Sequence, residues 1–133
     1  MAHLTLIRGL PGSGKSTIAK NYKALHLEAD MYFIHNGEYS FDKNLLKNAH
    51  DWCQNNARHA LENGLDVVVA NTFVKVWELQ KYAKIARNTG ATFSITEATG
   101  RYSNIHGIPV ETLRRMENQW EKVFVTAGMI NKL

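Results

Sequence analysis

A glycine-rich segment near the amino terminus carries the residue types that bind phosphate groups. Residues 9–17, Gly-Leu-Pro-Gly-Ser-Gly-Lys-Ser-Thr, match the pattern G-x-x-x-x-G-K-[S/T] without a mismatch. Gly12 and Gly14 let the backbone turn successive N–H groups toward anionic oxygens, and a following helix N-terminus adds a favourable dipole. Lys15 is then expected on the β- and γ-phosphates, and the Ser16 hydroxyl on Mg²⁺. The segment predicts nucleotide binding, with ATP as the default nucleotide.

The sequence around this segment fits the same interpretation. The apolar run at residues 4–7 has β-strand character, and residues 16–25 can continue as a helix. A phosphate-binding loop requires this order of strand, loop and helix. A glycine-rich turn that arose by chance is the alternative, and the full match in this context disfavours it. The candidate nucleotide-binding residues are Gly9, Leu10, Pro11, Gly12, Ser13, Gly14, Lys15, Ser16 and Thr17.

Carboxylates beyond the second expected strand are candidates to activate a phosphoryl acceptor. A kinase needs a group that orients the acceptor hydroxyl and accepts its proton. Asp30 is the best placed, and Glu28 and Glu97 are alternatives. On a strand, Glu28 and Asp30 would face the same side because they are two residues apart. An N-cap or turn aspartate is the alternative interpretation of Asp30.

Phosphoryl transfer also needs positive charge beyond Lys15, usually an arginine on a mobile lid. Arg101 lies in the irregular segment 98–108, which is the expected lid, and Arg114 and Arg115 lie on the last expected helix. A solvated surface role is the alternative for each of these arginines.

Polar and aromatic side chains near the strand ends are candidates to contact the second substrate. Asn71 and Thr72 follow the third expected strand. Ligands bind beyond the carboxyl ends of parallel strands, so this position favours a substrate contact. Tyr32, Phe33 and Tyr39 offer rings on which an acceptor base can stack. Simple packing is the alternative for these aromatic residues.

Strands and helices are predicted to alternate along the chain. Apolar patterns predict strands at residues 4–7, 26–30, 66–70 and 91–97, and helices at residues 16–25, from Asp42 to Gly64, at residues 75–89 and from Pro109 onward. The last helix is expected to line one face with Leu113, Met116, Trp120, Val123 and Phe124. This order predicts an α/β fold with a mainly parallel sheet of four to five strands between helix layers.

Composition sets the broad class of the protein. A chain of 133 residues is expected to form one domain, residues 1–133. The net charge of +4 makes nucleic acid a plausible partner. The lone Cys53 excludes an intramolecular disulfide and a cysteine-based zinc site. Without a visible signal peptide or membrane-spanning run, we expect a soluble cytoplasmic protein with no membrane partner; the oligomeric state is not predicted.

Several segments in this order resemble the small P-loop kinases of the polynucleotide 5′-kinase type. They also resemble the related AAA-family ATPases of the zeta-toxin-like group, especially stand-alone phage and bacterial members. The segments that carry the resemblance are residues 8–17, 29–33, 37–42, 49–53, 67–72 and 104–109. The resemblance implies a P-loop NTPase fold, phosphate and Mg²⁺ binding by Lys15 and Ser16, and activation of the acceptor hydroxyl by Asp30.

The sequence departs from that family pattern in two places. The segment Ala70-Asn71-Thr72-Phe73 lacks the usual aspartate, and Tyr102-Ser103 stand where arginines usually precede the Asn-x-His-Gly stretch of the shortened lid. Arg101 replaces those arginines only with a shift of register.

We therefore weigh three functions. The leading hypothesis is an ATP-dependent kinase that uses Lys15, Asp30 and Arg101 to phosphorylate a hydroxyl of a nucleic acid, a nucleotide or a modified nucleoside. The second is an ATP-binding interaction module without kinase turnover. The third is a kinase for a small metabolite.

Overall fold

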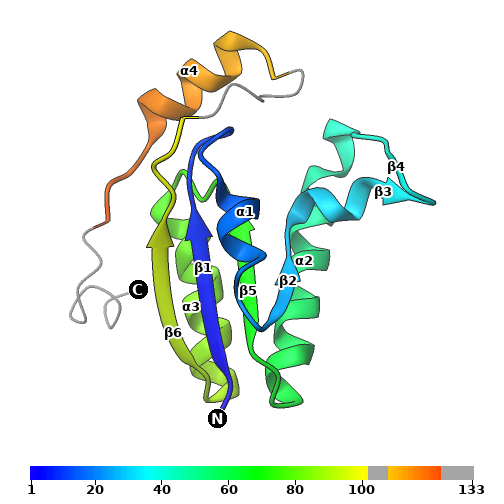
Figure 1. Cartoon of the computed structure of the whole chain (residues 1–133), viewed down its shortest axis with the longest axis vertical. Coiled ribbons are helices and arrows are strands. Elements are labelled where there is room, and N and C mark those ends of the chain that lie inside the picture. The colour runs from blue at the N-terminus through cyan, green and yellow to red at the C-terminus, as the bar shows by residue number, and fades with distance from the viewer. Residues whose placement is uncertain (102–107, 124–133) are drawn as a thin grey trace.

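A four-stranded parallel sheet forms the centre of the computed structural model, which describes residues 1–101 and 108–123. The strand order is β2-β5-β1-β6 (Figure 1). The strands are β1 (His3–Arg8), β2 (Leu25–Leu27), β5 (Val67–Asn71) and β6 (Thr92–Glu97). The apolar β-branched run of β5 is typical of a strand that is buried on both faces.

Helices and one small hairpin complete the described fold. The α-helices are α1 (Lys15–Ala19), α2 (Leu46–Glu62), α3 (Val76–Thr89) and α4 (Val110–Gln119). Two short 3₁₀ helices are η1 (Ala29–Phe33) and η2 (Lys43–Leu45). The hairpin joins β3 (Ile34–His35) to β4 (Glu38–Tyr39) through a turn at Asn36-Gly37, and it projects from the body of the molecule as an arm (Figure 1).

Alternate residues of the central strands pack on opposite faces of the sheet. Leu4 and Leu6 belong to the larger core, together with buried residues of α2 and α3. Ile7 and Val68 belong to a smaller core with Ala19 of α1. In Figure 1, α1 lies on one face and α2 and α3 lie on the other. The predicted α/β architecture with a mainly parallel sheet between helix layers is therefore confirmed.

The first helix is shorter than predicted, because it ends at Ala19 rather than near residue 25. Ala19 is its buried residue, whereas Tyr22 is 38% exposed, so a longer helix would have little core to cover. The chain turns instead and enters β2, where the Leu25 N–H donates to the Asp66 carbonyl at 2.9 Å.

The larger of the remaining differences from the prediction concern β2, α2 and the last helix. Strand β2 ends at Leu27 instead of residue 30, because residues 29–33 form η1. Asp42 caps η2 by accepting from the Asn44 N–H at 2.9 Å, and α2 begins only at Leu46. Pro109 is the N-cap of the last helix, which ends at Gln119 and therefore does not carry Trp120 or Val123. Phe124 lies outside the described residues.

Leu6→Ala should strongly destabilise the fold. Leu6 is 0% exposed in the central strand, so its truncation removes apolar contacts and leaves a cavity, at a cost of about 2–5 kcal/mol in unfolding free energy. Leu65→Ala is the matched control, because Leu65 is 55% exposed. Urea unfolding of both variants measures the difference. Equal, small losses in the two variants would contradict this description of the core.

Candidate functional site

The glycine-rich loop connects β1 to α1, in the strand, loop and helix order that the motif predicts. Gly12 has φ 80° and Gly14 has φ 92°, a left-handed backbone that favours glycine. The loop is tied to both neighbouring strand ends. The Gly9 N–H donates to the Thr72 carbonyl at 3.3 Å, and the Ser13 carbonyl accepts from the Gly100 N–H at 3.1 Å.

Lys15 is half-buried at the start of α1 and folds back over the loop. Its Nζ donates to the Leu10 carbonyl at 3.0 Å. Burial lowers the pKa of Lys15, and the negative charges of Glu28 and Asp30 act in the opposite direction. An incompletely solvated ammonium group of this kind gains by contact with an anion such as a phosphate group.

Ser16 and Glu28 lie together beside the loop. The Ser16 hydroxyl donates to Glu28 Oε1 at 3.0 Å, and Glu28 Oε2 pairs with His26 Nε2 at 2.5 Å. Glu28 has an extended backbone as the N-cap of η1, just beyond the end of β2. The strand alternation that would have put Glu28 and Asp30 on one side therefore does not apply. Sequence analysis had Glu28 only as an alternative carboxylate and gave no role to His26.

Asn71 makes a specific connection at the end of β5. Its Oδ1 accepts from the Ala29 N–H at 2.9 Å, and its Nδ2 lies 4.0 Å from Cys53 Sγ. Burial raises the pKa of the Cys53 thiol. Asn71 and Thr72 are both half-buried, and both tie neighbouring loops together through the contacts given above. The predicted substrate role of these two residues stays a prediction.

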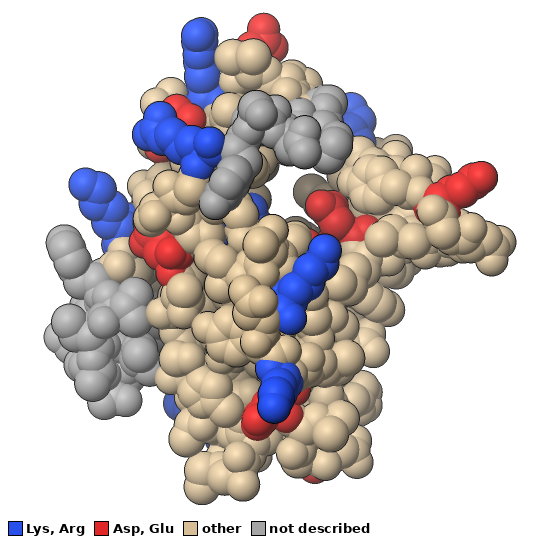
Figure 2. All heavy atoms as spheres, in the orientation of Figure 1, with Lys and Arg blue, Asp and Glu red and all other residues tan. Residues whose placement is uncertain are grey.

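Asp30 is exposed on η1, beside the hairpin arm. Its Oδ1 accepts from the Tyr39 hydroxyl at 3.3 Å. Partial burial and the Asp30 carboxylate raise the pKa of Tyr39. Figure 2 shows the molecule hollowed between the α4 side and the hairpin arm, with acidic side chains on the arm side of the hollow. Asp30 is thus exposed to solvent on the side of η1 that carries the hairpin arm.

The aromatic residues of η1 differ in their exposure. Phe33 is 2% exposed and packs edge-on against Tyr32 and Phe41, with ring centroids 5.5 and 5.2 Å away. The prediction that Phe33 stacks on an acceptor base is therefore wrong, because the core covers its ring. Tyr32 is half-buried and also contacts Trp52 at 6.0 Å. Its predicted substrate contact stays a prediction.

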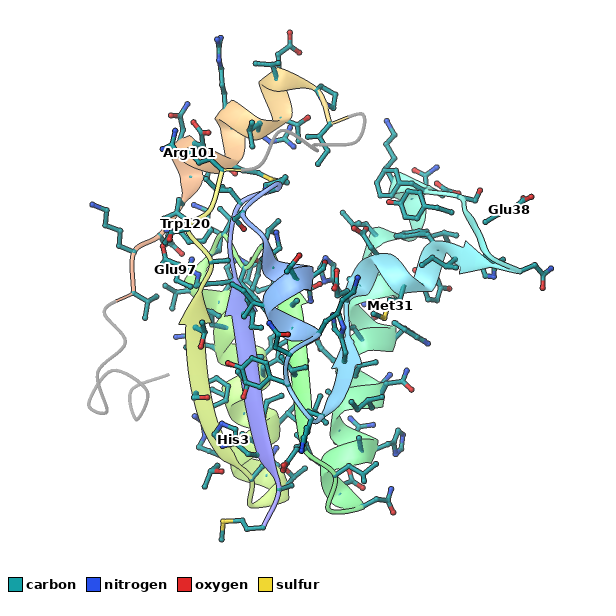
Figure 3. The ribbon with its side chains drawn as sticks, in the orientation of Figure 1. His3, Met31, Glu38, Glu97, Arg101 and Trp120 are labelled. Atoms are coloured by element: carbon teal, nitrogen blue, oxygen red, sulfur yellow. The ribbon has the colours of Figure 1, made fainter. Side chains whose placement is uncertain are left out.

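A cavity of about 500 Å³ lies on the β6 side of the loop. Arg101, which is exposed, and Leu113 of α4 are among the residues that line this cavity. Figure 3 shows Glu97, Trp120 and Arg101 along this side of the molecule. The residues that line the cavity are Leu10, Pro11, Gly12, Ser13, Glu97, Ala98, Thr99, Gly100, Arg101, Leu113, Glu117 and Trp120. The loop thus has the cavity on one side and Glu28 on the other.

Arg8 and Trp120 form a connection that the sequence analysis missed. Arg8 is 0% exposed, and its Nη2 donates to the Phe73 carbonyl at 2.6 Å. Its guanidinium carbon lies 3.9 Å from the centroid of the Trp120 ring. Burial lowers the pKa of Arg8, an effect that the nearby carboxylates, first among them Glu97, oppose. An arginine at the end of a buried strand is a sequence signal that could have identified this contact.

The remaining predicted residues are placed as follows. Arg114 and Arg115 are exposed on α4. The expected lid, 98–108, is described only at residues 98–101 and 108, so Tyr102, Ser103 and His106 lie outside the described residues.

The described part of the chain has no cluster of three or more His, Cys, Asp or Glu side chains that could hold a metal ion. Within residues 1–101 and 108–123, none of the helices has the length and apolar character that a membrane crossing needs.

Comparison with known proteins identifies relatives in sequence. Residues 4–99 match the family model described as AAA domain. NEDD4-binding protein 2 of Homo sapiens is 35% identical over 144 residues, an alignment that includes 96% of this chain. The chain spans 8% of the length of that human protein.

Solved structures of P-loop kinases share the fold. A chain of the Pnkp1/Rnl/Hen1 complex superposes with a TM-score of 0.58 and 18% identity, over 95% of this chain and 41% of the other. The APS kinase CysC of Mycobacterium tuberculosis, in complex with AMPPNP and APS, gives a TM-score of 0.55 and 18% identity, over 87% of this chain and 68% of the other. The predicted P-loop NTPase fold and the resemblance to small P-loop kinases are confirmed.

Lys15→Met should abolish nucleotide binding without destabilising the nucleotide-free protein. Burial of the charged lysine is unfavourable, as its lowered pKa indicates, so its removal should leave the melting temperature equal or higher. ATP at 100 times its Kd should raise the unfolding free energy of the wild type by about 2.7 kcal/mol. The unfolding free energy of Lys15→Met should be the same with and without ATP. Thermal unfolding of both proteins with and without ATP measures the difference.

Lys20→Met is the matched control, because Lys20 is exposed at the C-cap of α1. This variant should keep the full stabilisation by ATP. A clear ATP-induced shift in Lys15→Met would show that Lys15 does not bind the phosphates.

Proposed function

The chain belongs to the AAA domain family and has a P-loop kinase-like fold, and we propose that it transfers the γ-phosphoryl group of ATP to a hydroxyl of a nucleic acid, a nucleotide or a modified nucleoside. The observation that carries this proposal is the arrangement around the phosphate loop. A cavity lies on its β6 side, and an accessible carboxylate lies near Lys15 on the η1 side. A donor and an acceptor can therefore meet at the loop. We further propose that residues 1–133 form a single kinase domain.

The cavity supports a donor site for ATP. Its volume of about 500 Å³ is within the range of small-molecule pockets. Leu113 and Trp120 provide apolar contacts for a nucleobase, and Arg101 provides a positive charge at the rim. The N–H groups of the loop face the phosphates, and Lys15 exchanges its contact with the Leu10 carbonyl for the β- and γ-phosphates.

The Ser16 hydroxyl is suited to Mg²⁺, because hydroxyl and carboxylate oxygens are the ligands that this ion accepts and Ser16 lies 3.0 Å from a Glu28 oxygen. When bound, Mg²⁺ neutralises negative charge that develops on the phosphates.

The η1 side supports an acceptor site. Asp30 is exposed, and the Tyr39 hydroxyl holds one of its oxygens. We propose that Asp30 accepts the proton of the acceptor hydroxyl as that oxygen bonds to the γ-phosphorus. The bond between the γ-phosphorus and the bridging oxygen breaks, and ADP leaves with the bonding electron pair. Lys15 stabilises the charge on the phosphates during this step.

The positive net charge of the chain and its similarity to a solved structure support a nucleic-acid or nucleotide acceptor. The chain has a net charge of +4, which favours polyanions. One similar structure is that of the Pnkp1/Rnl/Hen1 RNA repair complex. Tyr32, Arg114, Asn71 and Thr72 are proposed to contribute to acceptor binding.

One observation favours the second candidate, an ATP-binding interaction module without turnover. The segment Ala70-Asn71-Thr72-Phe73 at the end of β5 lacks the aspartate that is usual in the family it resembles, and the Asn71 amide oxygen accepts from the Ala29 N–H. Without a carboxylate elsewhere to support Mg²⁺, the site would bind nucleotide and not react.

Asp30→Asn should bind ATP normally and lose phosphoryl transfer. The carboxamide cannot accept the proton, so the rate should fall about 10²- to 10⁴-fold. Transfer of labelled γ-phosphate is measured with 5′-hydroxyl DNA and RNA oligonucleotides, nucleosides, nucleotides and sugars as acceptors. Unchanged transfer in Asp30→Asn would exclude this residue as the base.

Two controls accompany this assay. Glu38→Gln removes an exposed carboxylate on the hairpin arm and should keep full activity. Lys15→Ala should label no acceptor. Label on a small metabolite alone would select the metabolite kinase, and ATP binding without any labelled acceptor would select the interaction module.

Leu113→Trp should weaken ATP binding and leave inorganic triphosphate binding unchanged. The larger side chain fills part of the proposed base site, at a cost of about 1–3 kcal/mol, or roughly 5- to 160-fold in Kd. Isothermal titration of both ligands measures the difference. Val110→Trp is the control, because Val110 is on the same helix, 62% exposed, and does not line the cavity. Equal weakening of both ligands would argue against a base site here.

A further inference from the structure

The end of β5 carries no carboxylate that could bind Mg²⁺. Asn71 is the last residue of β5, and both ends of its amide have partners: Oδ1 accepts from the Ala29 N–H at 2.9 Å, and Nδ2 faces Cys53 Sγ at 4.0 Å. A neutral amide with these contacts acts as a connection between β5 and η1. It does not supply the negative charge that a divalent cation requires.

Glu28 supplies a carboxylate at the same edge of the sheet. Strand β2, which precedes it, pairs with β5 up to Leu27 opposite Val69, so Glu28 follows directly where that pairing ends. Glu28 Oε1 accepts from the Ser16 hydroxyl at 3.0 Å. Glu28 is thus bonded to the one protein ligand that the loop motif offers to Mg²⁺.

We propose that Glu28 is the carboxylate of the Mg²⁺ site of this chain, acting with Ser16 and held in place by His26 and Asn71. This proposal rests on the proposed function, because it assumes that Mg²⁺ and nucleotide bind at the phosphate loop. It assigns to the end of β2 the carboxylate that accompanies Ser16 at this site.

The chemistry of the two groups suits this ion. Mg²⁺ prefers oxygen ligands and is commonly held by one or two carboxylates together with nucleotide phosphates and water. The Glu28 carboxylate and the Ser16 hydroxyl are oxygen ligands in mutual contact. A carboxylate in this place also offsets the positive charge of Lys15 in the nucleotide-free protein, as its influence on the Lys15 pKa indicates.

Two neighbours fix the position of Glu28. His26 Nε2 holds Oε2 at 2.5 Å, which leaves Oε1 directed at Ser16. Asn71 holds the Ala29 N–H, the next peptide group along the chain from Glu28. Side chains that orient a metal ligand in this way commonly affect metal affinity about 10- to 100-fold when they are replaced.

Asp30 has a different environment and is therefore assigned a different role. It is exposed, and its Oδ1 accepts from the Tyr39 hydroxyl of the hairpin arm at 3.3 Å. Glu28 is half-buried and bonded to Ser16 of the loop. One carboxylate thus faces the proposed metal and the other the proposed acceptor.

Glu28→Gln tests the assignment through metal binding itself. Mn²⁺ is titrated into the protein saturated with ADP and followed by electron paramagnetic resonance. Glu28→Gln should bind Mn²⁺ at least about 10- to 100-fold more weakly than the wild type, because replacing a side chain that only orients a metal ligand commonly costs that much. Its ADP affinity in EDTA should be unchanged or higher, because a negative charge near the phosphates is removed. Glu28→Asp, which keeps the charge on a shorter side chain, should give an intermediate Mn²⁺ affinity.

Asp30→Asn and Glu38→Gln are the matched controls. Asp30→Asn removes a second negative charge that acts on Lys15, so it reports the general electrostatic effect without the contact to Ser16. Glu38→Gln removes a carboxylate that Figure 3 shows on the hairpin arm. Both variants should bind Mn²⁺ within about twofold of the wild type, a shift well below that expected for a lost ligand. Melting temperatures without metal confirm that each variant is folded.

Failure of this inference is distinguishable from failure of the proposed function. Wild-type Mn²⁺ affinity in Glu28→Gln, or an equal loss in Asp30→Asn, would overturn the role of Glu28 and leave the kinase proposal in place. A selective loss in Glu28→Gln supports the inference even if no acceptor is ever labelled, because the readout is metal binding and not transfer. A wild-type protein that binds no Mn²⁺ with ADP would overturn both the metal site and the Mg²⁺-dependent transfer.

Discussion

The candidate site depends on the parallel pairing of β1 between β5 and β6. Parallel strands end at one edge of a sheet, so the loop that follows the central strand is flanked by the ends of both neighbours. Arg8, the last residue of β1, lies opposite Asn71 of β5 and Glu97 of β6. Together with the pairing of β2 to β5, this register brings the phosphate loop between the carboxylate side and the cavity. If β5 or β6 paired with β1 in a different register, the loop would be separated from the carboxylates or from the cavity.

Polar contacts then determine positions that apolar packing leaves open. Apolar contacts are not directional, whereas a hydrogen bond fixes both the distance and the orientation of its partners. Arg8 is 0% exposed and binds the Phe73 carbonyl while Trp120 covers its guanidinium group. Asn71 similarly fixes the start of η1 through the Ala29 N–H. Each contact involves residues at the end of a strand near the phosphate loop, so the surroundings of the loop are held by a few specific bonds.

Charges of both signs act on one another beside the phosphate loop. Burial lowers the pKa of Lys15, and the carboxylates of Glu28 and Asp30 oppose this shift. The two carboxylates are held by different partners, Glu28 by Ser16 and His26 and Asp30 by Tyr39. Environments that differ in this way allow two groups of the same chemical type to do different work.

The sequence by itself determined the local features of this protein. The loop motif, the strand predicted at residues 66–70 and the helix predicted at residues 75–89 follow from residue types and periodicity within short windows. The structure has this strand at Val67–Asn71 and this helix at Val76–Thr89, and the parallel α/β architecture follows from the alternation of strands and helices. Only the tertiary structure decided that Phe33 is buried, that Glu28 meets Ser16 and that Trp120 covers Arg8. These contacts join separate elements, and they depend on where β2 and α4 end. Those ends are set by packing and hydrogen bonds to distant parts of the chain, which periodicity along the sequence does not encode.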